Sequence, residues 1–205
     1  MPVTAPSPTV APDAGMQARF IAATLTCLAE HGHHGTTVRR IAKEAGVAPG
    51  LLTHYFAGKD ALIAQAYAQL ADEVLARLGS AVERAGTDPV ARLRAFISTS
   101  FGASDMGPDL LRVWVHFWAM ALTDTDVAAA HRDTDATYRT YLAGLLLPLV
   151  GDQHEAALLA RALAAMLDGM WLAWGLDPDG FDSDAQTALA LDMAARMLGN
   201  PAVSS

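Results

Sequence analysis

The sequence predicts an all-α protein, and the pattern of its 205 residues carries that prediction in two ways. Sustained alternation of polar and apolar residues and long β-branched runs, which are the signals of strands, are missing. Alanine and leucine are abundant, and glycines, prolines and acidic residues fall where helices would begin or end. Hydrophobic residues make up 52% of the chain, which is enough for one filled domain or a small domain joined to a larger one.

Apolar residues at helical spacing, bounded by capping and stop residues, predict the individual helices. In sequence order we expect helices at 16–31, 37–46, a very short one from 49, 58–79, 88–102, one from 108, 124–151 with a break near 148, 152–176 and 182–199. Thr37 can cap the second of these, and Gly32 is a stop signal for the first. The expected domains are a disordered tail (1–14), a small helical domain (15–60) and a larger helical domain (61–200).

The ends and composition of the chain indicate where it works. The first residues, MPVTAPSPTVAPDAG, contain four prolines and neither a basic segment nor an apolar core, so a disordered tail is expected rather than a signal peptide. The most apolar stretch, 158–176, carries Arg161 and Asp168, which argues against a membrane span. A lone Cys27 allows no internal disulfide, and we therefore expect a cytoplasmic protein.

Charge is distributed unevenly between the two expected domains. The net charge of −8 argues against a nucleic-acid partner when it is taken alone. Residues 1–60, however, hold five basic and four acidic side chains, and the cations cluster at 39–43 and 59. The small domain is therefore the part that can meet a phosphate backbone.

The segment AGVAPGLLTHYF, residues 45–56, joins the second and third expected helices through a tight turn. A helix, a turn at GVA and a second short helix form a helix-turn-helix, in which Gly46 supplies the positive φ of the turn. Gly50 removes a side chain where backbone can approach a phosphate. The side chains expected to face outward are those of Arg39, Leu51, Thr53, His54, Tyr55 and Lys59.

Residues 16–67 resemble the DNA-binding domain of the tetracycline-repressor (TetR) family, through FIAATLTCLAEHG, TTVRRIAKEAGV and GLLTHYFAGKDAL. Two positions differ from the family pattern, because Ala48 replaces a capping Ser or Thr and Leu51 replaces a small or polar residue. The resemblance implies a homodimeric transcriptional regulator, usually a repressor, which releases its operator DNA when its carboxy-terminal domain binds a small molecule. The candidate DNA-binding residues are Thr37, Arg39, Arg40, Pro49, Gly50, Leu51, Thr53, His54, Tyr55 and Lys59.

The second half is similar to the BetI-type, choline-responsive branch, through LLRVWVHFWAMAL and LARALAAMLDGMWLAWGL. Aromatic residues in both segments recur at helical spacing, and aromatic faces attract quaternary ammonium groups. The candidate ligand-binding residues are Trp114, Phe117, Trp118, Asp168, Trp171 and Trp174. A plain packed core is the alternative. A quaternary ammonium compound is the first expected effector, and a neutral lipophilic molecule is the second.

The segment 156–176 is apolar nearly all round, so a helix there needs neighbours on two sides. One stripe contains Leu163 and Met170, and the last helix adds Leu189, Met193 and Met197. This pattern predicts a four-helix interface between two subunits, with a wholly internal core as the alternative.

Other chemistry is not indicated by the sequence. His31, His33 and His34 lack a partner Cys or acidic cluster at ligand spacing, so a solvated turn is expected there rather than a metal site. No phosphate-binding glycine loop, nucleophile elbow or pair of catalytic carboxylates is found, and we expect neither an enzyme nor a cofactor. A helical enzyme and a helical binding or interaction protein without a DNA-binding role remain as alternative classes, which salt-dependent DNA binding would separate from a regulator.

Overall fold

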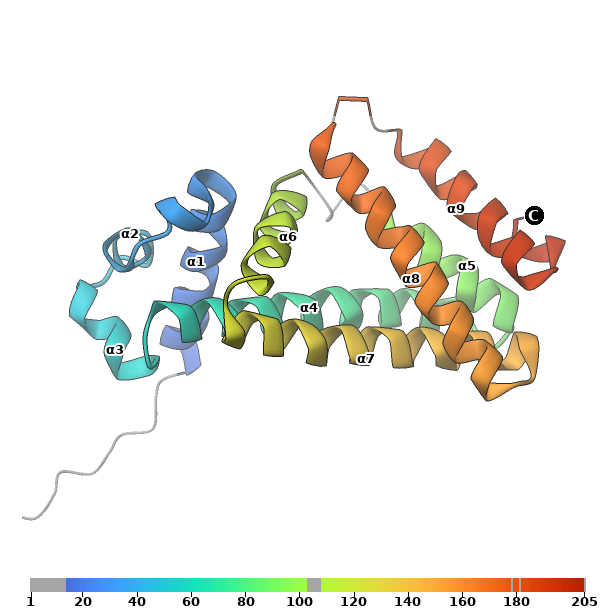
Figure 1. Cartoon of the computed structure of the whole chain (residues 1–205), viewed down its shortest axis with the longest axis horizontal. Coiled ribbons are helices and arrows are strands. Elements are labelled where there is room, and N and C mark those ends of the chain that lie inside the picture. The colour runs from blue at the N-terminus through green and yellow to red at the C-terminus, as the bar shows by residue number, and fades with distance from the viewer. Residues whose placement is uncertain (1–13, 103–107, 178, 181, 205) are drawn as a thin grey trace, which may run out of the picture.

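The computed structural model describes residues 14–102, 108–177, 179–180 and 182–204, and the regular structure within these ranges is entirely helical (Figure 1). The all-α prediction is confirmed. The helices are α1 (Ala14–Gly35), α2 (Val38–Glu44), α3 (Leu52–Tyr55), α4 (Lys59–Arg84), α5 (Pro89–Ser100), α6 (Pro108–Ala121), α7 (Thr125–Val150), α8 (Gln153–Leu176) and α9 (Ser183–Leu198), with 3-10 turns at Pro49–Leu51 and Pro201–Val203. Of the expected tail, residues 1–13 lie outside the described residues, and Ala14 begins α1.

Two helix ends and one expected break differ from the sequence prediction, each for a local reason. Gly32 (φ 63°, ψ −176°) kinks α1, and one more turn follows to Gly35. α4 continues past Gly79 to Arg84, because Leu78, Ala81 and Val82 extend its buried stripe. α7 is not broken at Pro148, which lies in its final turns, and it ends at Gly151 in the left-handed conformation.

Helices α1, α2 and α3, with the start of α4, form a small head at one end of the molecule (Figure 1). Its core contains Phe20, Ile41, Leu52 and Phe56, all buried. The rings of Phe20 and Phe56 meet edge to face with centroids 5.9 Å apart. This core sets the angle between α1 and the short helices that follow it.

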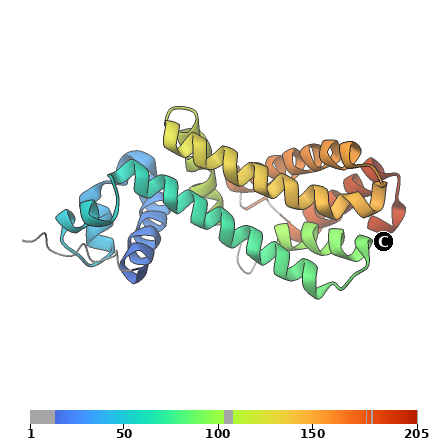
Figure 2. The ribbon, with the colours of Figure 1, turned by 90° about the horizontal axis from the view of Figure 1, so that it is seen from below.

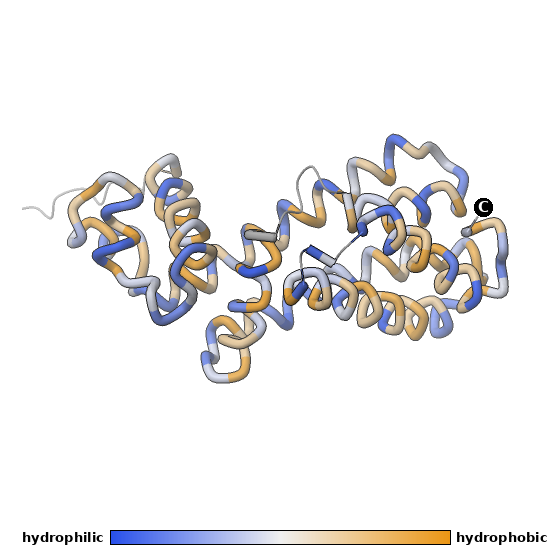
Figure 3. The backbone as a smooth tube through the Cα atoms, turned by 90° about the horizontal axis from the view of Figure 1, so that it is seen from above, coloured by the Kyte–Doolittle hydropathy of each residue, from blue (hydrophilic) through white to orange (hydrophobic). Residues whose placement is uncertain are grey.

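The rest of the chain forms an elongated body along α4 and α7, which run side by side (Figures 1 and 2). α5, α8 and α9 gather at the far end, and α6 packs against α1 of the head as well as α7 and α8 of the body. Hydrophobic stretches recur along the long helices of the body (Figure 3). α6 therefore joins the head to the body, while α4 belongs to both.

α8 is the one described helix that is long and apolar enough, by length and composition, to cross a membrane. A core helix of a soluble protein passes the same test. Packing against α6, α7 and α9 buries one side of α8, which includes Leu163, Leu167 and Trp174. The packed side identifies α8 as a core helix of the body.

Candidate DNA-binding surface and effector cavity

A side-chain cap and a backbone hydrogen bond fix the local geometry of the helix-turn-helix. Thr37 caps α2 by accepting a hydrogen bond from the Arg40 amide at 3.3 Å. Gly46 adopts φ 67°, and the Val47 amide then donates to the Ala42 carbonyl at 2.9 Å. A side chain at Gly46 would strain this left-handed turn, so glycine fixes the path between α2 and the recognition segment.

The recognition segment begins as a 3-10 turn at Pro49–Leu51 and continues as α3. Ala48 provides no side-chain cap for this turn. The Thr53 hydroxyl donates to the Gly50 carbonyl at 2.9 Å, which ties α3 back onto the turn. A Cβ on Gly50 would meet nothing within 4 Å, so the backbone there is open to an approaching phosphate.

The candidate DNA-binding side chains divide into exposed and half-buried sets. Those exposed are Thr37, Arg39, Arg40, Pro49, Gly50, Thr53 and His54. Leu51, Tyr55 and Lys59 are half-buried, and the Tyr55 ring packs against Phe20 with centroids 5.9 Å apart. The Arg40 guanidinium donates to the Gly35 carbonyl at 2.6 Å, so this side chain is already engaged within the head. Arg39 and His54 are the exposed candidates with long polar side chains for which no hydrogen bond within the described part of the head is seen.

Lys43 is an exposed cation that the sequence pattern placed in the basic cluster but not among the candidate contacts. It lies four residues after Arg39 on α2, and therefore on the same face of the helix. This i, i+4 spacing was the signal in the sequence that could have identified Lys43 as a candidate contact. Both cations are therefore exposed together on one face of α2.

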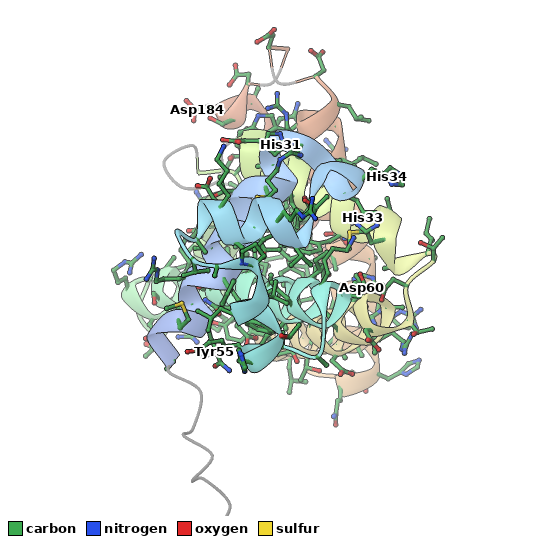
Figure 4. All side chains as sticks on the ribbon, turned by 90° about the vertical axis from the view of Figure 1, so that its left-hand side faces the viewer. His31, His33, His34, Tyr55, Asp60 and Asp184 are labelled. Atoms are coloured by element: carbon green, nitrogen blue, oxygen red, sulfur yellow. The ribbon has the colours of Figure 1, made fainter. Side chains whose placement is uncertain are left out.

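Lys59 opens α4, next to the recognition segment of the head. Its ammonium lies 3.9 Å from the Asp60 carboxylate, and 29% of its side chain is exposed. Figure 4 looks onto the head, with His33 between His34 and Asp60 and with Tyr55 at the opposite end. Burial, followed by the nearby Lys59 charge, lowers the pKa of His33. Within the described residues, no group of three or more His, Cys, Asp or Glu side chains is placed to hold a metal ion.

A cavity opens in the body between α4, α6, α7 and α8. Its empty volume is about 740 Å³, part of which is open to solvent. Of the candidate ligand-binding residues, Trp114, Trp118, Asp168 and Trp171 line it. Phe117 lies behind the wall, fully buried, with its ring centroid 4.8 Å from that of Tyr67. Trp174 packs against Leu111 instead.

The aromatic walls form one connected cluster. Trp114 lies at its centre, with ring centroids 5.1 Å from Tyr67 and 6.5 Å from both Trp118 and Trp171. The Trp171 indole donates a hydrogen bond to the Ser100 carbonyl at 2.9 Å, which fixes it to the end of α5. The hydrogen bond thus fixes Trp171, while Trp114 and Trp118 are positioned by ring contacts.

Three carboxylates face the same cavity, from Asp72, Asp135 and Asp168. Asp135 forms an ion pair with Arg139 one turn further along α7. Asp168 is exposed to solvent at the cavity, and the protein around its carboxylate desolvates it in part. The resulting desolvation, with a smaller contribution from Asp135, raises the pKa of Asp168 to about 6. Electrostatically, the cavity favours a cation.

Sequence reasoning missed the polar wall that α7 contributes. His131, Thr134, Asp135 and Tyr138 line the cavity at positions i, i+3, i+4 and i+7 of that helix. The Tyr67 hydroxyl lies 2.8 Å from Nδ1 of His131, and burial raises the pKa of Tyr67 to about 12. Their helical spacing was the signal in the sequence that could have revealed a shared face. Polar residues at this spacing usually form a solvent-exposed face, so it did not point to a cavity.

Comparison with known proteins supplies the context for both sites. Residues 20–66 match the family described as bacterial regulatory proteins, tetR family, and residues 89–199 match the BetI-type transcriptional repressor, C-terminal, family. The HTH-type transcriptional regulator BetI 1 of Chromohalobacter salexigens is 34% identical over 195 residues, which cover 91% of this chain and 94% of the relative. The BetI regulator of Stenotrophomonas maltophilia is 34% identical over 175 residues, with 84% and 87% covered.

Solved structures share the same architecture. A transcriptional regulator from Pseudomonas aeruginosa superposes with a TM-score of 0.81 at 35% identity, covering 91% of each chain. A regulator from Saccharomonospora viridis in complex with choline superposes at 0.75 with 17% identity, covering 88% of this chain and 96% of that one. FadR from Bacillus subtilis in complex with stearoyl-CoA superposes at 0.73 with 19% identity, covering 86% and 96%.

These matches agree with the helix-turn-helix head and the cavity-bearing body. The relatives are transcriptional regulators rather than enzymes. The chain is a DNA-binding transcriptional repressor with a ligand-binding domain. It belongs to the TetR family, with a carboxy-terminal domain of the BetI type.

Proposed function

We propose that the effector of this repressor is a quaternary ammonium cation held in the body cavity. The observation that carries the proposal is the meeting of three tryptophans and the Asp168 carboxylate in one cavity. Aromatic faces attract such cations by about 0.5–2 kcal/mol each, and a carboxylate nearby adds to the attraction. The choline complex of the Saccharomonospora viridis regulator supports the same class of ligand for a cavity of this fold.

A neutral lipophilic molecule is the second candidate effector. Val74, Leu75 and Leu78 from α4 and Leu167 from α8 give the cavity an apolar wall. The stearoyl-CoA complex of the Bacillus subtilis FadR shows that another protein of this fold binds a ligand with a long acyl chain. The carboxylates favour the cation, because burying them against a neutral ligand leaves their charge without compensation.

Titration of tryptophan fluorescence with choline tests the effector class directly. The Trp118→Ala and Trp171→Ala variants remove two cavity walls and should each weaken binding by about tenfold, in line with the loss of one cation–π contact. Trp174→Phe is the matched control, since that indole lies outside the cavity lining and a phenyl ring retains packing against Leu111 and Trp171; this variant should bind choline with unchanged affinity. Equal affinity in the wild type and both cavity variants would exclude the aromatic cage.

For DNA, we propose that residues 15–60 form the operator-binding domain and residues 61–200 the effector and dimerisation domain. Arg39 and His54 reach base edges, and Lys59 contacts a phosphate. The exposure of Arg39 and His54 and the position of Lys59 at the start of α4 support these roles. The remaining candidates, Thr37, Arg40, Pro49, Gly50, Leu51, Thr53 and Tyr55, shape or line the same face of the head.

The protein acts as a cytoplasmic homodimer that pairs through α8 and α9. Support comes from the large apolar side chains that a single chain leaves exposed on these helices, which are Leu158, Leu172, Leu176, Leu189 and Met193. An apolar patch of this kind marks an interaction surface. A two-fold dimer presents two heads, and the operator is then expected to contain symmetric half-sites.

The effector releases DNA by favouring one spacing of the two heads over another. α4 is the lever, because it begins at Lys59 and carries Tyr67, Val74 and Leu78 along the cavity wall. A ligand shifts this equilibrium only by the difference in its affinity for the two arrangements. The cavity must therefore differ in shape between the DNA-bound and released dimers.

A further inference from the structure

The ionisable groups around the effector cavity are not in balance. α4 contributes Tyr67 and Asp72, α6 contributes no ionisable lining residue, α7 contributes His131, Asp135 and Tyr138 with Arg139 behind them, and α8 contributes Asp168. Three carboxylates thus meet one guanidinium. The surplus is negative, and it lies inside a concave, largely apolar surrounding.

The carboxylates of Asp135 and Asp168 differ in whether a nearby cation neutralises them. Asp135 already has Arg139 as its partner on the same helix. No hydrogen bond or ion pair joins the Asp168 carboxylate to another residue of the described chain, although the charge of Arg139 acts on it at longer range. An uncompensated carboxylate in such surroundings is most easily neutralised by a proton. Asp168 is therefore the cavity carboxylate that takes up a proton first as the pH falls.

We propose that in acid a cationic effector enters this cavity in exchange for a proton on Asp168, so that both effector binding and the release of DNA weaken as the pH falls. The inference rests on the proposed cationic effector. The exchange balances: one positive charge enters, one proton leaves for solvent, and the net charge of the cavity stays the same. The carboxylate left behind on Asp168 is the counter-ion of the bound cation.

The direction of the pH effect follows from this exchange. Burial raises the pKa of Asp168 to about 6, so above about pH 7 the carboxylate is already ionised and affinity for the cation should be constant. Below that pKa a proton has to leave before the cation is compensated. Affinity should then fall by up to about tenfold for each further unit of pH, until it reaches the affinity of the neutral Asp168→Asn variant.

The effects of two other groups on cation binding have to be distinguished from that of Asp168. Protonation of the His131 imidazole would place a second cation in the cavity and weaken binding in the same direction. Asp72 also faces the cavity and is exposed, as Asp168 is, so Asp72→Asn is included as the control for its charge. Substitution of His131 by Gln removes the titratable ring while keeping a polar group near the Tyr67 hydroxyl.

The test is a set of fluorescence titrations with tetramethylammonium chloride and with choline chloride between pH 5 and pH 8 at constant ionic strength. The wild type and His131→Gln should lose affinity below about pH 6, and Asp168→Asn should bind more weakly with no pH dependence. Calorimetry at pH 6 in two buffers of different ionisation enthalpy should show release of about half a proton per cation in the wild type, and none in Asp168→Asn. Circular dichroism verifies that both variants are folded.

The outcomes distinguish this inference from the proposed effector class. Cation binding that is equally tight from pH 5 to pH 8 would overturn proton exchange and leave the cationic effector in place. Binding of neither cation at any pH would overturn both. A pH dependence that persists in Asp168→Asn, or vanishes in His131→Gln, would assign the proton to another group and overturn the role of Asp168.

Discussion

Gly32 of α1 and His116 of α6 touch where the head meets the body: a Cβ on Gly32 would lie 3.1 Å from Cε1 of the His116 ring. The kink at Gly32 also holds the buried Thr36, whose hydroxyl donates to the Gly32 carbonyl at 2.8 Å. Trp114 and Trp118 flank His116 at two residues on either side, which places them on the opposite side of α6. One helix therefore contacts the head with one face and the cavity with the other.

Gly32→Ala should destabilise the protein by more than the backbone conformation alone accounts for. The backbone of Gly32, at φ 63° and ψ −176°, lies in a region that glycine alone adopts readily, which costs an alanine about 1–3 kcal/mol, and the His116 ring would also have to move. The control introduces Gly32→Ala into a His116→Ala background, in which the added carbon meets no ring. Denaturant unfolding at fixed protein concentration measures the loss of stability in each background. Equal losses in the two backgrounds would show that the contact with His116 contributes nothing.

Lys59→Ala should weaken binding to every DNA sequence alike. A phosphate contact releases a counter-ion, so the slope of log affinity against log salt should decrease by about one per subunit contact. Arg132→Ala removes an exposed cation from α7, away from the head, and should leave the slope unchanged. Titrations of labelled duplex at several salt concentrations provide the measurement. A slope as steep as that of the wild type would remove Lys59 from the DNA-binding surface.

Arg39→Ala and His54→Ala should instead reduce sequence preference. Both side chains are exposed on the DNA-binding face of the head, and each base contact contributes about 1–3 kcal/mol of discrimination. Selection of binding sites from random duplexes, followed by competition with scrambled DNA, measures this preference. Were both variants to retain the full preference of the wild type, base reading would lie elsewhere in the recognition segment.

Asp168→Asn should stabilise the folded protein at pH 8 and have little effect at pH 4. The folded pKa of Asp168, about 6, is higher than the unfolded value, so the native state holds more protons between about pH 4 and pH 6. Stability from this group is therefore greatest in acid and decreases as the pH rises through the folded pKa. Thermal unfolding of wild type and variant from pH 4 to pH 8 measures the effect. Parallel curves at all pH values would contradict the desolvation of this carboxylate.

The helices follow from the sequence because their determinants are local. The residues that cap α2, α5, α7, α8 and α9, namely Thr37, Asp88, Asp124, Asp152 and Asp182, stand next to the apolar repeats that they precede. The break predicted near Pro148 was wrong because it rested on a local signal alone. A proline in the final turns of a helix removes few hydrogen bonds, so α7 continues through it.

The cavity was less accessible to sequence reasoning because its depth depends on tertiary packing. Spacing correctly puts Trp114 and Trp118 on one face of α6, yet it cannot distinguish the cavity wall from the layer behind it, where Phe117 lies. On α8 the apolar stripe that contains Leu163 suggested a subunit interface. The structure buries Leu163 within one chain, beside Leu146 and Ala194. A one-dimensional pattern does not show which apolar face meets its own chain and which meets a partner.

Met193→Asp should therefore disrupt dimerisation, whereas Leu163→Asp should disrupt folding. Met193 is 37% exposed in the single chain, so a charge there should disrupt pairing through α8 and α9 and yield folded monomers. Leu163 is only 2% exposed, and an uncompensated charge at this position should unfold the body. Leu122→Asp changes an apolar side chain that is 85% exposed between α6 and α7, and it should leave assembly unchanged.

Sedimentation velocity at micromolar concentration reports the oligomeric state, and circular dichroism reports the helices. The proposed interface predicts dimers for the wild type and Leu122→Asp, helical monomers for Met193→Asp, and loss of helix for Leu163→Asp. A wild type that sediments only as a monomer would reject dimerisation. A Met193→Asp variant that remains dimeric would move the interface away from α9, because a buried aspartate without a partner is too costly for a stable apolar interface.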